Sequence, residues 1–149
     1  DDHYLSDADL NNFQQNIKDL ANRVAAYESL RDRELAIVQP AADYLAEEFP
    51  STDSRQLERV IKHWLTIFRY AAMAMVLQDS EFLNSRVLEW LPDLAQAYQI
   101  RDIELKFYRL LQVQLKSSLS EEHLVLIQPY LEEGYKILLN GKPSLVASA

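Results

Sequence analysis

Six side chains between residues 62 and 73 have the chemistry to hold a ligand. They are Lys62, His63, Thr66, Arg69, Tyr70 and Met73. At about 100° per residue, Lys62, Thr66, Arg69 and Met73 align along one strip of a helix, with His63 and Tyr70 beside it. Two cations about two turns apart suit two anionic arms of one ligand, such as propionates.

The same strip also fits a plainer interpretation. Charged and polar side chains cover the water-facing side of most helices in proteins, and they need no ligand there. Spacing alone leaves both interpretations open.

The helix that carries the strip has the strongest pattern in the chain. Its apolar residues repeat every three to four positions and form one broad stripe, separate from the strip: Leu57, Val60, Ile61, Trp64, Leu65, Phe68, Ala71, Ala72, Met75 and Val76. The sequence therefore predicts a long core helix over about 57–76.

Two helices are expected before this core helix. Ser6 has the features of an N-cap, and an apolar repeat follows it until the pattern weakens near Ser29. A second helical stretch runs on to Phe49–Pro50, where the residue before proline disfavours helix. Further helices are predicted over about 80–90, 92–99, 102–115 and 120–139.

Composition agrees with an all-helical domain. The 149 residues include 48% hydrophobic residues, only two glycines and no cysteine, and the net charge is −8. Few glycines argue against a β fold or a phosphate loop. The negative net charge argues against a nucleic-acid binder. The absence of cysteine excludes disulfides and thiol catalysis. With no apolar run long enough for a membrane span, a cytoplasmic protein is expected.

No constellation for catalysis or a metal cage is visible, so the chain is not expected to be an enzyme. The expected pile of crossed helices is globin-like, which raises the question of haem. The segment SRVLEWLPDLAQAYQ, where a globin would carry its proximal histidine, contains none. Ordinary haem ligation is therefore disfavoured, and His63 is the remaining candidate for an axial ligand.

Four segments carry a resemblance to a known family: YLSDADL (4–10), AADYLAEEFP (41–50), VIKHWLTIFRY (60–70) and LPDLAQAYQI (91–100). In order and spacing, they are similar to motifs of the phycobiliproteins, the bilin-carrying globin relatives of phycobilisomes. The resemblance covers nearly the whole chain. It implies an all-α, globin-like (phycocyanin-like) fold with two additional N-terminal helices.

The departures from that family bear on function. The family's bilin-bearing cysteine falls on Val60, so the usual thioether cannot form. Its propionate-pairing arginine falls on Lys62, and its pyrrole-binding aspartate falls on His63. Arg69 matches an arginine of the family. The pattern is similar to the bilin biosynthesis-associated globins, which implies non-covalent binding of a bilin as carrier, buffer or sensor.

The resemblance also leaves two alternatives. One is a pigment-free interaction module, because the first two helices of the family pack against a partner subunit; here that apolar face would be Leu10, Phe13, Ile17 and Leu20 in a homodimer. The other is a haem-binding sensor that uses His63. In each case we expect one globin-like domain over 1–149, with dimerisation helices at about 4–30, a core at about 31–140 and a loose tail at 141–149.

Overall fold

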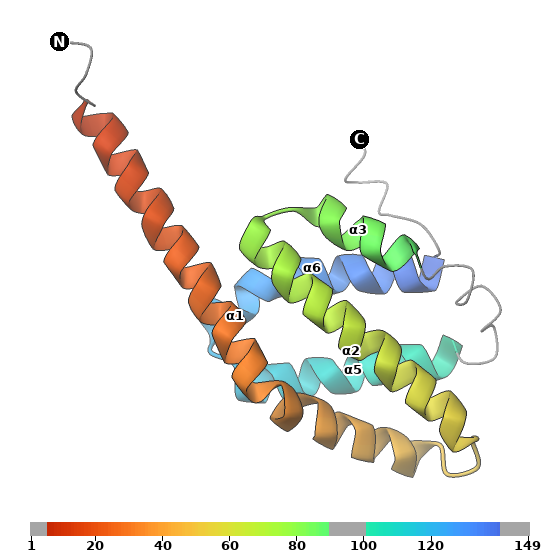
Figure 1. The fold of residues 1–149 in the computed structure, drawn as a ribbon. Helices are drawn as coiled ribbons and strands as arrows, with labels where there is room; N and C mark the ends of the chain where they lie inside the picture. Colours follow the sequence, from red (N-terminus) through yellow and green to blue (C-terminus); the bar gives the residue numbers. More distant parts are fainter. Residues whose placement is uncertain (1–5, 90–100, 141–149) are drawn as a thin grey trace.

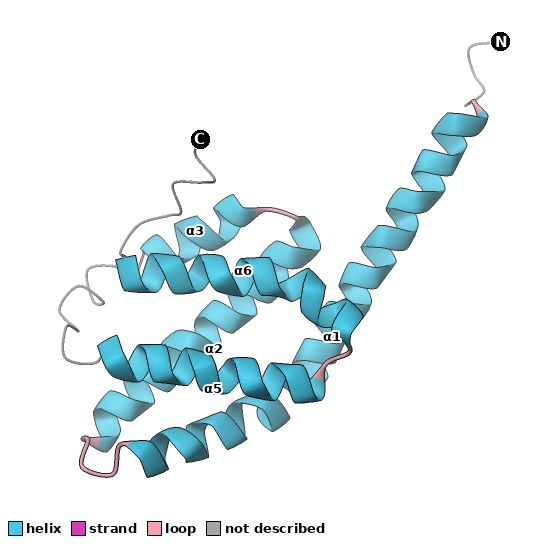
Figure 2. Ribbon diagram, turned by 180° about the vertical axis from the view of Figure 1, so that it is seen from behind, coloured by secondary structure: helices cyan, strands magenta, loops and turns pink. Residues whose placement is uncertain are grey.

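The computed structural model describes residues 6–89 and 101–140, which form five α-helices (Figure 1). They are α1 (Asp7–Glu48), α2 (Ser54–Leu77), α3 (Ser80–Leu88), α5 (Arg101–Ser118) and α6 (Glu121–Asn140). No strand occurs within these two ranges (Figure 2). The predicted all-α fold class is confirmed. The helix expected over 92–99 lies outside the described residues.

Side-chain caps set the start of several helices. The Ser6 hydroxyl accepts the backbone N–H of Asp9 at 3.1 Å, as predicted for α1. Asp79 accepts two backbone N–H groups in the first turn of α3, at 3.0 and 3.3 Å. Ser120 accepts the N–H of His123 at 3.2 Å and begins α6. Each cap satisfies a donor that the first turn of a helix otherwise leaves unpaired.

The two N-terminal helices expected on either side of Ser29 form one continuous helix of 42 residues, α1. The segment around Ser29 contains no glycine or proline, so its weaker apolar pattern does not interrupt the helix. The helix instead changes direction in its C-terminal part (Figure 1), where Pro40 lies inside it. Proline lacks the N–H for the bond to residue 36, and its ring crowds that carbonyl.

The first half of α1 projects away from the rest of the fold (Figure 1). We call residues 7–25 the arm, because Ala26 is the first buried residue of the helix. Its large apolar side chains are all exposed, by 38 to 56%: Leu10, Phe13, Ile17, Leu20 and Val24. At the base of the arm, Arg23 Nε donates to the carbonyl of Val76 on α2 at 3.2 Å.

Helix α2 is the centre of the fold, and it contacts α1, α3, α5 and α6. Much of its predicted apolar stripe is buried, including Val60, Trp64, Phe68 and Met75. By length and composition alone α2 could cross a membrane, although 44% of its apolar window is buried by the neighbouring helices. The central helix of a packed bundle meets the same criterion.

Helix α6 approaches α2 closely at a glycine. A Cβ placed on Gly134 would lie 2.6 Å from Cγ2 of Ile67, which is fully buried. An alanine would fit at this helix crossing only if Ile67 or one of the helices shifted. Glycine thus allows α6 to approach α2 closely here.

Candidate functional site

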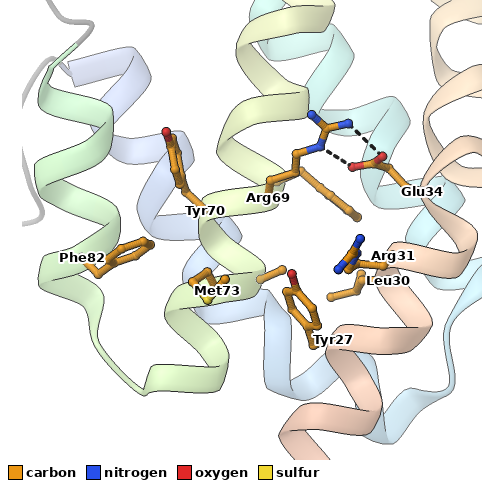
Figure 3. Close-up of a pocket in the computed structure, with 10 residues that line it drawn as sticks. Tyr27, Leu30, Arg31, Glu34, Arg69, Tyr70, Met73 and Phe82 are labelled. Carbon is orange, nitrogen blue, oxygen red and sulfur yellow. Dashed lines mark hydrogen bonds and ion pairs between the residues drawn. The ribbon is translucent and has the colours of Figure 1, made fainter.

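A cavity of about 490 Å³ lies where α1, α2 and α3 meet (Figure 3). Its lining combines aromatic, aliphatic and charged side chains: Tyr27, Leu30, Arg31, Glu34, Phe68, Arg69, Tyr70, Ala72, Met73 and Phe82. The size and the mixture of apolar walls with a few charged groups are typical of small-molecule sites.

Only three of the six predicted residues line this cavity. Arg69, Tyr70 and Met73 line it, whereas Lys62, His63 and Thr66 do not. Lys62 is exposed, and the Thr66 hydroxyl donates to the Lys62 carbonyl at 2.9 Å. The hydroxyl of Thr66 is therefore already engaged by the backbone of its own helix.

Arg69 and Glu34 form the strongest polar contact of the cavity. Arg69 Nε donates to Glu34 Oε1 at 2.9 Å, and Nη2 donates to Oε2 at 3.1 Å. The hydrogen bond to Glu34 raises the pKa of Arg69 above its usual value. The Arg69 side chain is 60% exposed, so water screens its attraction to Glu34. An ion pair this exposed stabilises a fold by at most about 1 kcal/mol.

Aromatic rings supply the remaining walls. The Arg31 guanidinium lies 5.8 Å from the ring centroid of Tyr27, a cation–π distance. Tyr70 and Phe82 meet edge to face, with centroids 6.1 Å apart. Two guanidinium groups beside flat apolar walls suit a conjugated ligand that carries acidic groups.

Sequence reasoning missed Tyr27, Arg31, Glu34 and Phe82. The first three follow one another at spacings of four and three, so a helix places them on one face. That spacing was a usable signal, but it does not reveal that the face meets Arg69. The meeting of α1 with α2 is a tertiary contact between residues 35 positions apart.

His63 points to a different part of the fold. Its Nδ1 lies 2.8 Å from Oε1 of Glu104 on α5, and both side chains are largely buried. Burial raises the pKa of Glu104, while the hydrogen bond to His63 lowers it. The nearby Trp64 indole also lowers the pKa of Glu104. Trp64 Nε1 and Glu104 Oε2 have no hydrogen-bond partner, so the indole acts on the carboxyl from beyond hydrogen-bond geometry.

Two further observations concern a pigment or a metal. Val60, at the position that the resemblance assigns to the attachment cysteine, is fully buried in the core. Within 6–89 and 101–140, no group of three or more His, Asp or Glu side chains is placed to hold a metal ion.

Comparison with known proteins gives one family. The model of the family described as "Phycobilisome protein" matches residues 1–138. No curated protein matches the chain.

Proposed function

Because the chain belongs to the phycobilisome protein family, whose members bind bilins, we propose that it binds a linear tetrapyrrole without a covalent bond. Family members generally hold the pigment through a cysteine, and this chain has none. The observation that carries the proposal is the cavity between α1, α2 and α3, with its two arginines and aromatic walls.

The proposed contacts use the residues that line this cavity. Arg69 and Arg31 receive the two propionates, and Tyr70, Phe82 and Met73 contact the conjugated system. Arg31 replaces Lys62 as the partner of the second acid, because Lys62 does not line the cavity. A charge-assisted hydrogen bond contributes roughly 1.5 to 3 kcal/mol, so two such contacts favour acid-bearing ligands.

The biological role is proposed on the same basis. Members of the family are soluble, pigment-binding structural proteins rather than enzymes. We place this chain in the cytoplasm as a non-catalytic carrier, buffer or sensor linked to bilin metabolism. Loss of the covalent bond makes the pigment exchangeable, which suits those roles better than light harvesting.

Titration with biliverdin tests the proposal directly. We expect a saturable change in the red and far-red absorption of the folded protein. Acid denaturation should then release all pigment, because no thiol retains it. A haem titration tests the haem alternative, because a saturable Soret band would favour it. No saturable change with either pigment would refute tetrapyrrole binding.

The exposed arm favours a second candidate, a protein-interaction module that forms a homodimer. A contiguous apolar face on a soluble helix is normally covered by a partner. A twofold dimer is the simplest closed assembly for one sequence. Dimerisation and pigment binding use different surfaces, so a dimer without a pigment would leave the interaction module as the better account.

A further inference from the structure

Glu34 brings a negative charge into a cavity that otherwise offers positive charge. Among the described lining residues, the charged groups are Arg31, Glu34 and Arg69. Figure 3 shows Glu34 turned toward the Arg69 guanidinium, and the two side chains share two hydrogen bonds. A carboxylate of the chain thus fills one of the two guanidinium edges that Arg69 has for pairing with a carboxylate.

We propose that Glu34 is a built-in competitor, which an acidic group of the ligand displaces from Arg69. This inference rests on the proposed function of the cavity. A guanidinium has five N–H donors, and its Nε–Nη2 edge fits one carboxylate in a paired contact. Glu34 fills that edge, so a propionate gains the same paired contact there only when Glu34 leaves.

The exposure of the pair makes the exchange feasible. Arg69 is 60% exposed and Glu34 is 26% exposed, so water can replace each contact as it breaks. The Arg31 guanidinium lies at a cation–π distance from the ring of Tyr27. Once Glu34 has turned away, the guanidinium groups of Arg31 and Arg69 are both available to the two acidic groups of the ligand.

Competition by Glu34 makes the cavity distinguish ligands with free acids from their neutral esters, which its shape alone does not. A ligand with free acids can compete for Arg69, whereas its neutral ester cannot and meets the cavity with the Glu34–Arg69 pair intact. The negative charge of Glu34 also repels any acid that does not displace it. Removing that charge should therefore strengthen the binding of acids and leave the binding of esters unchanged.

The test compares biliverdin with biliverdin dimethyl ester in three proteins: the native chain, Glu34→Gln and the control Glu48→Gln. Glu48 is also an α1 glutamate in an ion pair, with Lys106 at 3.2 Å, and it does not line the cavity. Each variant removes one negative charge. We expect Glu34→Gln to lower the Kd for biliverdin about fivefold and to leave the ester unchanged. Glu48→Gln should change neither.

Equal biliverdin affinity in the native chain and Glu34→Gln would overturn the inference. An equal gain for the ester would also overturn it, because the effect would then not depend on charge. Glu34→Asp, which keeps the charge, should bind biliverdin less tightly than Glu34→Gln.

A separate experiment distinguishes failure of the inference from failure of the proposed function. If no variant binds biliverdin, the bilin proposal fails, and 1-naphthoate then serves as a small aromatic acid. Tighter naphthoate binding to Glu34→Gln than to the native chain would support competition by Glu34 for another acid. No difference with naphthoate would overturn it.

Discussion

His63 on α2 and Glu104 on α5 share a hydrogen bond of 2.8 Å in the interior of the fold. The bond joins two helices at a position where water has little access, since the side chains are 15% and 5% exposed. A buried acid next to an imidazole links the stability of the fold to pH.

The first prediction concerns that dependence. Burial raises the pKa of Glu104 above its usual 4.5, so the folded state holds the proton more strongly than the unfolded chain. Protonated Glu104 stabilises the folded state fully below pH 4.5. This stabilisation is lost as the pH rises through the raised pKa of Glu104 in the folded state. The free energy of unfolding of the native chain, relative to Glu104→Gln, should fall over that window. Chemical unfolding at several pH values measures it.

The control for this experiment is Glu58→Gln, an exposed residue on α2. This control measures the pH dependence that follows from the loss of an exposed carboxylate on the same helix. A pH dependence for Glu104→Gln that is no steeper than that of the control would contradict its assignment to the buried acid.

The second prediction concerns the crossing of α2 and α6. In Gly134→Ala the new Cβ would lie 2.6 Å from Ile67 Cγ2. Overpacking of this kind costs about 1–3 kcal/mol, and the better helix propensity of alanine offsets about 1 kcal/mol. We expect a net loss of up to about 2 kcal/mol in unfolding experiments. Ile67→Ala should lower the free energy of unfolding less when it is added to Gly134→Ala than when it is made in the native chain, because it removes the side chain that the new Cβ meets. If the two losses simply add, there is no steric contact between the two positions.

The third prediction concerns the arm. If its apolar face pairs two copies, sedimentation at micromolar concentration should give about twice the monomer mass of 17.3 kDa. Phe13→Glu should shift the mass toward the monomer, because it places a charge on that face at its most exposed apolar side chain. Helical content by circular dichroism should be unchanged. A native chain that is already monomeric would remove the homodimer proposal.

The fourth prediction separates two cations of α2. Arg69→Ala should raise the Kd for biliverdin about tenfold or more, because it removes a charge-assisted contact of roughly 1.5 to 3 kcal/mol. Lys62→Ala removes the same charge from the same strip outside the cavity lining, so it should have a much smaller effect. Equal losses in the two variants would place the ligand along the whole strip instead of in the cavity.

The helix starts and stops were predictable because their causes are local. Ser6, Asp79 and Pro50 act on neighbouring residues, so their chemistry can be inferred from a few positions of sequence. The continuity of α1 was not predicted, because a weak apolar pattern around Ser29 resembles a break. The buried face of the helix begins nearby, at Ala26, and the backbone runs from the arm into the core without a break.

The lining of the cavity was predictable only in part, for a similar reason. Helical spacing brought Arg69, Tyr70 and Met73 together, since all three lie on one helix. It could not show that Glu34 from α1 pairs with Arg69, or that Glu104 from α5 draws His63 inward. Those outcomes depend on how helices cross, which periodicity within one helix does not encode.

The continuity of α1 makes the arm a lever. At 1.5 Å per residue, the arm extends roughly 28 Å from its base. Tyr27, Arg31 and Glu34, which line the cavity, follow directly on that base in the same helix. A rotation of this segment by about 10° sweeps the tip of the arm through roughly 5 Å, because a helix without a break transmits the angle along its length. Small adjustments at the cavity wall are thus magnified at Leu10 and Phe13.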